Sequence, residues 1–178
     1  MQLLFDRPGM VVNGKTIYFK EIGTKTNGLR RVVKYTGKVN YIDDSGNYVC
    51  EMDYEDGRPF ANGLARVKQN GLWGFINRKG ELVCECCFEM LRDWQGSYTA
   101  GYADGGWWII DRNGEKLNED KFDAVYFWED KGIKVKKKRK YGLLNKEGKA
   151  ITECIYDAIY GSTKAILKKK HVVPTYIA

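Results

Sequence analysis

Hydrophobic residues along this chain fall into short runs that are separated by turn-forming residues. Three runs follow one another between residues 64 and 84, and they read "LARVK", "LWGFI" and "ELVC". Each run has the length and the content of β-branched, aromatic and leucine residues expected of a strand, and the connections between the runs are short. The pattern predicts a three-stranded antiparallel meander.

The turns of this meander have a recurring sequence. The second turn reads "DDSG", "NRKG", "DRNG" and "NKEG" at residues 43–46, 77–80, 111–114 and 145–148. Asp or Asn opens a type I turn through its side chain, and the final glycine takes the left-handed conformation that a bulged hairpin requires. The first turn carries Gly37, Gly71 and Gly105, which predicts positive φ in three copies. Arg139 occupies this place in the fourth copy, so that hairpin either changes its turn or tolerates strain.

The runs and turns recur with a 34-residue period. Three sets of residues have this spacing: Trp73, Trp107 and Tyr141; the glycines at 46, 80, 114 and 148; and the aromatic residues Tyr54, Phe88, Phe122 and Tyr156. An acid follows each aromatic residue of the third set. A fixed period of this length indicates a repeat architecture. We predict an all-β fold of about four antiparallel meander repeats over residues 26–161, with an atypical cap hairpin at 1–25 and a half-repeat cap at 162–178. The period is equally compatible with an open twisted array and a small propeller-like ring.

These residues resemble the WG-repeat family of bacterial proteins, also called KWG repeats. The resemblance is clearest in "FANGLARVKQNGLWGFINRKGELV" at residues 60–83, and on the 34-residue spacing it covers about three quarters of the chain. Two copies depart from the family pattern, because Val39-Asn40 and Trp107-Trp108 stand where Trp-Gly is expected. The resemblance implies a β-rich repeat array and supplies no general catalytic residues.

Length and composition are those of one soluble domain. The chain has 178 residues, of which 43% are hydrophobic, so we expect a single domain over residues 1–178. Asp6 and Arg7 interrupt the first apolar run, and no segment has the apolar length of a membrane crossing. We therefore expect a cytoplasmic protein with no leader and no membrane partner. Five cysteines, three of them in "CECC" at 84–87, favour reduced thiols over a disulfide framework.

A metal site is one hypothesis for these cysteines. Cys84 and Cys86 would share a strand face and could join Cys154 and His171 around Zn²⁺. The C-x-C-C spacing is not that of a zinc ribbon, however, and Cys84 and Cys86 stand at the same repeat positions as Cys50 and Cys154. A packing role is therefore favoured, and we expect no metal.

Catalytic residues are equally hard to find. Asp123 and Asp157 follow aromatic residues at equivalent repeat positions, where turn capping or solvation is favoured over acid–base work. Trp73 beside Gly74 is expected to pack between β-units rather than to bind a ligand. With one histidine, no nucleophile motif and no phosphate-binding loop, we expect no enzyme, no cofactor and no small-molecule substrate.

Charge is distributed unevenly along the chain. Residues 131–171 hold 13 Lys or Arg against 3 acids, whereas residues 81–130 hold 4 against 12. The predicted partner-binding residues are Lys134, Lys136, Lys137, Lys138, Arg139 and Lys140 in one run, Lys168, Lys169, Lys170 and His171 in a second, and Arg30, Arg31 and Lys34 in the first copy. Lysines on an exposed edge strand also prevent aggregation, which is the alternative explanation. A bulky, charged Arg139 where three copies keep glycine favours a phosphate contact.

Two functional hypotheses follow from this charge pattern. The first is a non-enzymatic binding module that docks on RNA, DNA or a nucleoprotein through its basic C-terminal ridge, and that inhibits or regulates a nuclease, including an RNA-guided defence nuclease. The second is a purely protein-binding repeat array in which the acidic middle and the basic end recognise complementary patches on a partner. Acidity in the middle copies confines any nucleic-acid contact to the ends of the array.

Overall fold

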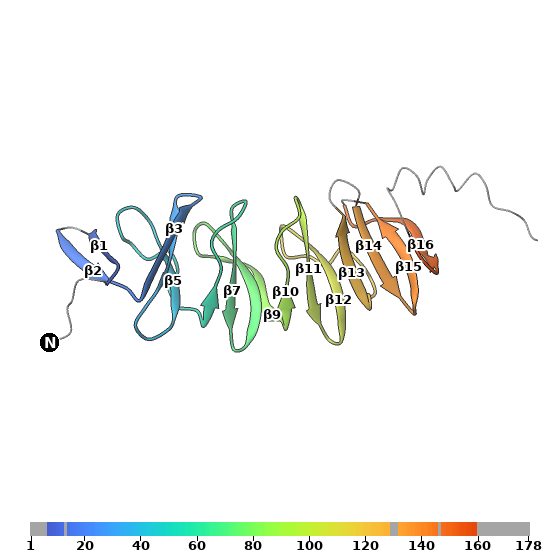
Figure 1. Ribbon diagram of the computed structural model, residues 1–178, viewed down its shortest axis with the longest axis horizontal. Coiled ribbons are helices and arrows are strands. Elements are labelled where there is room, and N and C mark those ends of the chain that lie inside the picture. The colour runs from blue at the N-terminus through green and yellow to red at the C-terminus, as the bar shows by residue number, and fades with distance from the viewer. Residues whose placement is uncertain (1–6, 13, 129–131, 146, 160–178) are drawn as a thin grey trace, which may run out of the picture. The chain divides into compact units, whose positions relative to one another are not determined.

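The computed structural model describes residues 7–12, 14–128, 132–145 and 147–159. Within these ranges the chain forms strands, turns and bridges and has no α-helix, so the predicted all-β class is confirmed. The described part accordingly contains no helix that could cross a membrane. Its strands form several small, separate antiparallel sheets (Figure 1).

The chain divides into two compact units. The first comprises Met1–Trp94 with Arg112–Glu115, and the second comprises Gln95–Asp111 with Lys116–Ala178.

The first unit holds a hairpin and two sheets. The hairpin pairs β1 (Gly9–Val12) with β2 (Lys15–Tyr18). The first sheet has the strand order β3 (Glu21–Thr26), β4 (Leu29–Val33), β5 (Val39–Ile42). The second sheet has the strand order β6 (Asp56–Gly57), β7 (Leu64–Gln69), β8 (Leu72–Asn77), β9 (Leu82–Phe88). The short strand β10 (Met90–Leu91) follows. Neighbouring strands in each sheet are consecutive in sequence and antiparallel, as a meander requires.

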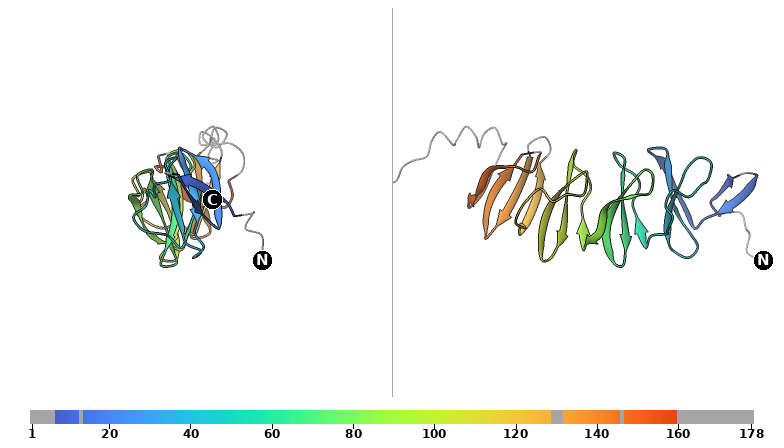
Figure 2. Two further views of the ribbon diagram at one scale, coloured as in Figure 1. Left: turned by 90° about the vertical axis from the view of Figure 1, so that its left-hand side faces the viewer. Right: turned by 180° about the vertical axis from the view of Figure 1, so that it is seen from behind.

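The second unit repeats this arrangement. It contains the hairpin β11 (Tyr98–Ala103) and β12 (Gly106–Asp111) and the sheet β13 (Ala124–Trp128), β14 (Gly132–Lys137), β15 (Lys140–Leu144), β16 (Ala150–Tyr156). The four strands of this sheet run side by side in the front view (Figure 1) and in the view from behind (Figure 2, right). The sheets that begin at β6 and β13 thus have one strand more than the predicted meander, because the segment after each aromatic-acid pair also joins the ladder.

The predicted period is visible in the strand register. One antiparallel bridge occupies the same place in each of the four repeats, and these bridges are Val39–Tyr54, Trp73–Phe88, Trp107–Phe122 and Tyr141–Tyr156. Each bridge lies one full period after the previous one, so the aromatic that closes a repeat pairs with the residue at its Trp position. The repeat spacing found in the sequence is therefore confirmed.

The turn after the Trp-Gly strand forms as its residues predict. Asn77 accepts hydrogen bonds at Oδ1 from the backbone N–H groups of Lys79 and Glu81, at 2.9 and 3.2 Å. Asp43 and Asn145 hold their own turns through the same side-chain oxygen. The closing glycines at positions 46, 80, 114 and 148 have φ between 76° and 85°, which confirms the predicted left-handed conformation.

Glycine in the Trp-Gly pair is explained by the strand that faces it. A methyl group on Gly74 would lie 2.5 Å from the carbonyl oxygen of Cys84, where the β8–β9 ladder is irregular. A methyl group on Gly142 would lie 2.9 Å from Sγ of Cys154, at the matching irregularity between β15 and β16. A strand bulges toward these positions and leaves no room for a side chain.

The first copy accommodates asparagine at this position in a different way. Asn40 is buried, and its Nδ2 donates to the carbonyl oxygens of Cys50 and Met52 and to Oδ1 of Asp53, at 3.2, 3.3 and 2.8 Å. Residues 50–53 form no strand. The segment still bridges β5 at Tyr48 and Tyr54, and between these bridges the Asn40 side chain satisfies backbone carbonyl groups in place of a regular ladder.

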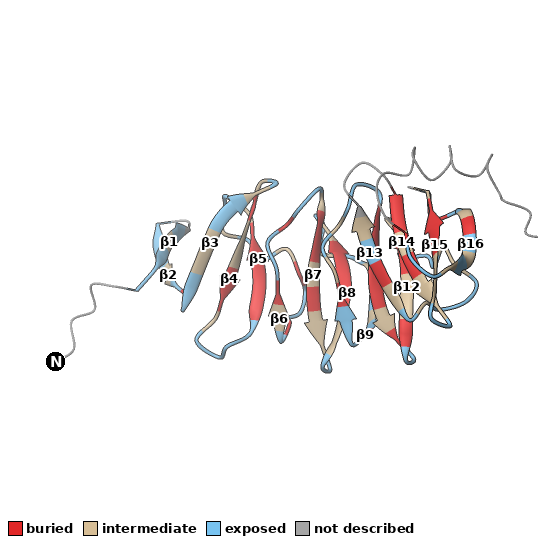
Figure 3. Cartoon of the chain, turned by 45° about the vertical axis from the view of Figure 1, so that its right-hand side comes forward, coloured by how far each residue is buried: buried red, intermediate tan, exposed pale blue. Residues whose placement is uncertain are grey.

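Each unit has an apolar core between its sheets' inner faces. In the first unit Tyr41, Val67 and Ile76 are fully buried in one cluster. In the second unit Ile109, Val125 and Ile133 are fully buried in another. Buried residues follow β7, β8, β14 and β15, while the hairpin ends are exposed (Figure 3).

Two glycines with the same backbone conformation give a test of the packing at the turns. Gly80 and Gly71 have φ of 84° and 77°, but only Gly80 lies against backbone, where a methyl group would overlap the carbonyl oxygen of Val49. We expect Gly71→Ala to lower the free energy of unfolding by about 1 kcal/mol through backbone strain. Gly80→Ala should cost a further 1–3 kcal/mol, roughly, from overpacking. Urea unfolding of both variants checks this, and equal losses would contradict the packing argument.

Candidate nucleic-acid interface

The first predicted basic run forms the hairpin β14–β15. Ile133 and Val135 are buried, so the alternation of the strand places Lys134 and Lys136 on its opposite face. Lys138 and Arg139 lie at the hairpin tip and are exposed, and Lys137 and Lys140 face each other below it. The structure therefore places these six residues on one hairpin.

Two tyrosines lie among these lysines. Tyr126 of β13 is directly opposite Lys134, and Tyr141 of β15 is directly opposite Lys136. Nζ of Lys134 lies 4.8 Å from the ring centroid of Tyr126 and 5.4 Å from that of Tyr141, and Nζ of Lys136 lies 5.4 Å from Tyr141. We call these four residues the basic-aromatic face. Cations and aromatic rings on one sheet surface are the two group types that single-stranded nucleic-acid sites combine.

The hairpin tip keeps its turn at the cost of strain. Lys138 and Arg139 have φ of 49° and 68°, close to the values of Asn70 and Gly71 in the β7–β8 hairpin. Two consecutive residues with side chains in the left-handed region cost about 1–2 kcal/mol each. Of the two outcomes expected at Arg139, the structure shows the strained one.

An acid caps this tip. A carboxylate oxygen of Asp123 accepts a hydrogen bond from the backbone N–H of Lys138 at 2.8 Å. Glu55 does the same for the N–H groups of Asn70 and Gly71, and these bonds lower the pKa of Glu55. The predicted capping is therefore confirmed for Asp123, and Glu55 caps its own tip in the same way, whereas exposed Asp157 pairs with Lys140.

Two of the predicted basic residues form ion pairs within the unit. Lys137 lies 2.8 Å from Asp120, and Lys140 lies 2.5 Å from Asp157. The hydrogen bond from Lys137 lowers the pKa of the Asp120 carboxyl. Pairs of this kind are exposed and exchange readily with solvent ions, so they reduce the local positive charge without burying it.

The predicted basic residues of the first copy make contacts within the first unit. Nε of Arg31 donates to the carbonyl oxygen of Gly57 at 2.7 Å, and its side chain is only 18% exposed. Arg30 donates to the carbonyl oxygen of Gly23. Nζ of Lys34 lies 2.7 Å from Asp53. Arg31 therefore joins its strand to β6 of the next sheet in the first unit, and Lys34 is held by an acid within its own repeat. The second basic run, 168–171, lies outside the described residues and stays a prediction.

Asp53, the acid that pairs with Lys34, is partly buried, and burial opposes ionisation of its carboxyl group. The Asp53 carboxyl nonetheless has a lowered pKa, because hydrogen bonds from Lys34 and Asn40 outweigh the effect of burial. Lys34 also lies 4.1 Å from the ring centroid of Tyr48. These contacts support a structural role for Lys34.

A second group of cations and an aromatic ring occupies the same repeat positions in the first unit. Arg58, Arg66, Lys68 and Trp73 stand two full periods before Tyr126, Lys134, Lys136 and Tyr141. The three cations lie 5.7, 5.8 and 5.7 Å from the ring centroid of Trp73. Sequence reasoning missed Tyr126, although this double spacing would have found it.

Acids distinguish the two groups. Arg66 lies 2.7 Å from Asp93 and also donates to the carbonyl oxygen of Leu91, and Arg58 lies 3.6 Å from Asp56. The residue that matches Asp56 in the second unit is Ala124. An acid that pairs with a cation in the earlier group is therefore replaced by a methyl group beside the basic-aromatic face.

Burial governs the chemistry of two of the cysteines. Cys50 is buried and Cys86 is half-buried, and burial raises the pKa of each thiol to about 11. Within the described ranges, no three His, Cys, Asp or Glu side chains are grouped closely enough to hold a metal ion. His171 lies outside those ranges, so the expected absence of metal stays a prediction.

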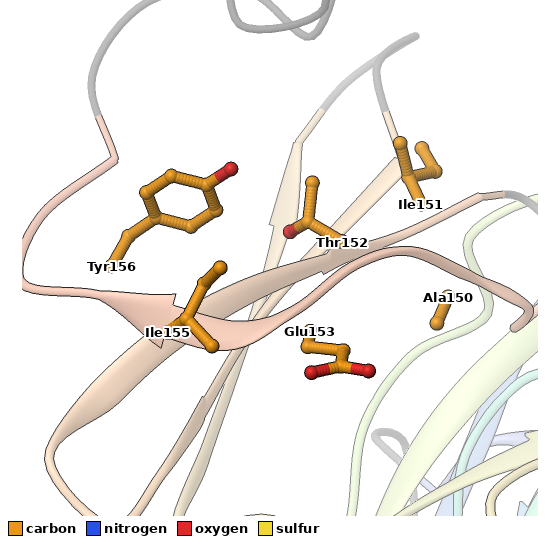
Figure 4. Close-up of a pocket in the computed structure, with 6 residues that line it drawn as sticks. All are labelled: Ala150, Ile151, Thr152, Glu153, Ile155 and Tyr156. Carbon is orange, nitrogen blue, oxygen red and sulfur yellow. The ribbon is translucent and has the colours of Figure 1, made fainter. Parts of the chain in front are cut away.

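The hollows of the second unit are shallow. One, of about 400 Å³, follows β16 and is lined by Ala150, Ile151, Thr152, Glu153, Ile155 and Tyr156 (Figure 4). Another, of about 380 Å³, lies beside the hairpin tip and carries Asp120, Lys121, Asp123, Lys137 and Lys138. The first has a single ionisable carboxylate and the second mixes both signs of charge beside the exposed tip.

Comparison with known proteins identifies the repeats. The sequence profile of the family described as WG containing repeat matches residues 41–73, 73–102 and 141–164. The chain carries repeats of the WG family. The resemblance found in the sequence is thereby confirmed, and the match supports a β-repeat binding module.

Solved structures give a more distant likeness. The computationally designed Ika4 protein has a TM-score of 0.37 and 13% identity over 81% of this chain and 95% of its own. BamB from Moraxella catarrhalis has a TM-score of 0.37 and 13% identity over 76% of this chain and 50% of its own. This chain thus spans about half the length of BamB. No curated protein sequence matched.

The strained tip of the WG repeat at β14–β15 gives a stability test. The double variant Lys138→Asn, Arg139→Gly restores the Asn-Gly sequence that the β7–β8 hairpin has at the same positions. We expect the free energy of unfolding to rise by about 1–2 kcal/mol, because both residues then adopt positive φ at lower cost. Urea unfolding measures the change, and an unchanged or lower stability would show that the tip carries no strain.

The raised pKa of Cys86 gives a test of thiol chemistry. Burial keeps this thiol neutral, so its thiolate fraction at pH 8 is small and rises until the pH nears 11. We expect alkylation of Cys86 at pH 8 to be about 100-fold slower in the folded chain than in the urea-unfolded chain. In the folded chain the rate should rise about tenfold per pH unit between pH 8 and the pKa. Mass spectrometry of the Cys86 peptide measures both rates. Equal rates in the folded and unfolded chain would contradict the assignment.

Proposed function

We propose that this WG-repeat chain is a non-enzymatic binding module that docks on nucleic acid, free or within a nucleoprotein, through the hairpin β14–β15. The observation that carries the proposal is the hairpin tip, where Lys138 and Arg139 are exposed and both have positive φ. Asparagine and glycine would form the same turn with less strain, as Asn70 and Gly71 do. A charged residue whose backbone is strained at an exposed tip is typical of a binding site.

Charge at this hairpin suits a phosphate backbone. Lys136 lies on the basic-aromatic face, and Lys138 and Arg139 extend the positive charge to the tip. Cations that contact phosphates release condensed counterions, and this release supplies most sequence-independent affinity. The surrounding acids Asp120 and Asp157 pair with Lys137 and Lys140 and leave the tip cations exposed.

The size of this surface suits a local contact. Residues 81–130 hold 12 acids against 4 Lys or Arg, which disfavours a duplex gripped along several repeats. A module that binds through one hairpin would instead attach to an accessible strand. Attachment to the guide or target strand of an RNA-guided nuclease would obstruct that enzyme, and such regulation is the role that we propose for this module.

Neutralising the tip and its neighbour tests the proposal. The triple variant Lys136→Gln, Lys138→Gln, Arg139→Gln should bind short fluorescein-labelled RNA and DNA more weakly, whatever their sequence. The slope of log affinity against log salt should flatten by roughly 0.7–0.9 for each phosphate that the variant no longer touches. Fluorescence anisotropy across a salt series measures both quantities, and circular dichroism checks that the fold is kept.

A matched control separates local contact from net charge. The variant Arg58→Gln, Lys68→Gln, Lys79→Gln removes the same number of charges from the first unit and should keep most of the affinity. Equal losses in the two variants would show that only the net charge matters. If the parent protein binds no RNA or DNA at low salt, where such binding is strongest, the proposal fails and a protein-binding array takes its place.

A further inference from the structure

We propose that the basic-aromatic face binds unpaired nucleotides, with a base stacked on Tyr126 and phosphates held by Lys134 and Lys136. This inference rests on the proposed function and narrows its ligand to single-stranded nucleic acid. A tip that contacts only phosphates would accept a duplex equally well, so the two proposals differ in what they predict.

Exposure and register support a stacking role for Tyr126. Its side chain is 41% exposed on strand β13, whereas its strand neighbour Val125 is fully buried in the core. Lys134 is its direct cross-strand partner, and the ammonium of Lys134 lies 4.8 Å from the centroid of the ring. One cross-strand pair therefore offers an aromatic ring and a cation to a bound nucleotide. The ring can stack on the base, and the cation can contact the phosphate of the same nucleotide.

The two rings present separate planes. The centroids of Tyr126 and Tyr141 are 6.4 Å apart, and the ring planes are inclined by 46°. Rings at this inclination do not enclose one base between parallel faces. Tyr126, the more exposed ring, therefore provides the stacking platform, and half-buried Tyr141 positions Lys134 and Lys136 through its ring.

The lysines that cover these rings can move to a phosphate. An exposed contact between an ammonium and a ring changes an equilibrium by about two- to fivefold. Stacking of a base on an aromatic side chain changes affinity by about 5- to 150-fold, and the ammonium gains a phosphate contact in exchange. A stacked base therefore contributes more affinity than the ring contact that Lys136 gives up.

A duplex does not offer these groups. Its bases are already paired and stacked, so a side chain reaches a base plane only at the cost of unstacking. Unpaired bases are available to aromatic residues whatever their sequence, because each has a π-face. Tyr126 therefore distinguishes a single strand from a duplex, while the tip cations do not.

The first unit provides a natural comparison. Arg58 stands at the position of Tyr126, and its ion pair with Asp56 and the pair of Arg66 with Asp93 hold the cations around Trp73 within the protein. In the second unit Tyr126 and Ala124 replace Arg58 and Asp56. The exposed aromatic residue at 126 and the replacement of the acid at 124 therefore occur together on strand β13.

Binding of three probes of equal length tests the inference with the intact chain. They are a labelled single-stranded DNA, the same strand with abasic residues at every position, and its duplex. The parent should bind the single strand about 5- to 150-fold more tightly than the abasic strand, which has the same phosphates and no bases. The variant Tyr126→Leu should lose this preference and bind both strands as weakly as the parent binds the abasic one.

Two controls keep the result specific. Tyr126→Phe retains the ring and should retain the preference, and Tyr18→Leu, which removes a tyrosine that is 50% exposed elsewhere, should leave it unchanged. Equal affinity of the parent for single strand, abasic strand and duplex would overturn this inference while the proposed function stands. Failure to bind any of the three probes would overturn both.

Discussion

Close approach of a turn to the preceding repeat is the constraint on which this structure depends. Gly80 closes its turn against the backbone of Val49 and Cys50, and Gly148 closes its turn against Leu117. In both cases the contact is made just under one period back along the chain, and a single methyl group would overlap its neighbour. Only glycine combines the positive φ of this turn with so close a contact. The 34-residue period is therefore fixed by packing as well as by strand length.

The opposite end of each sheet has more freedom. At the hairpin tips, a methyl group on Gly37 or Gly71 would have no atom of the described residues within 4 Å apart from its chain neighbours, so a side chain there meets mainly the restriction of its backbone angle. This freedom allows Lys138 and Arg139 to occupy the fourth tip, with an acid from the neighbouring strand holding the turn. The repeat thus confines variation to the end that packing leaves open, and the proposed binding surface lies at that end.

Lysines at one and the same repeat position have different contacts in different copies. The position of Lys136 is lysine in three repeats, yet Lys34 is held by Asp53 and Lys68 lies over Trp73 among paired arginines. The same residue type at the same strand position is therefore held by an acid in the first copy and lies over an aromatic ring in the other two.

The sequence by itself determined the features that depend on local interactions. The Asx-Gly turns, the strand runs and the period could be predicted because each turn is made by its own four residues, as Asn77 and Gly80 show. Only the tertiary structure decided the fourth strand of a sheet, the internal pairing of Arg31, and the place of Tyr126 beside Lys134. Asp56 and Gly57 lack a strand pattern and pair only because a neighbouring strand offers its edge. Charge runs in a sequence likewise do not reveal which cations a distant acid will neutralise, since Lys137 and Lys140 each pair with an acid 17 residues away along the chain.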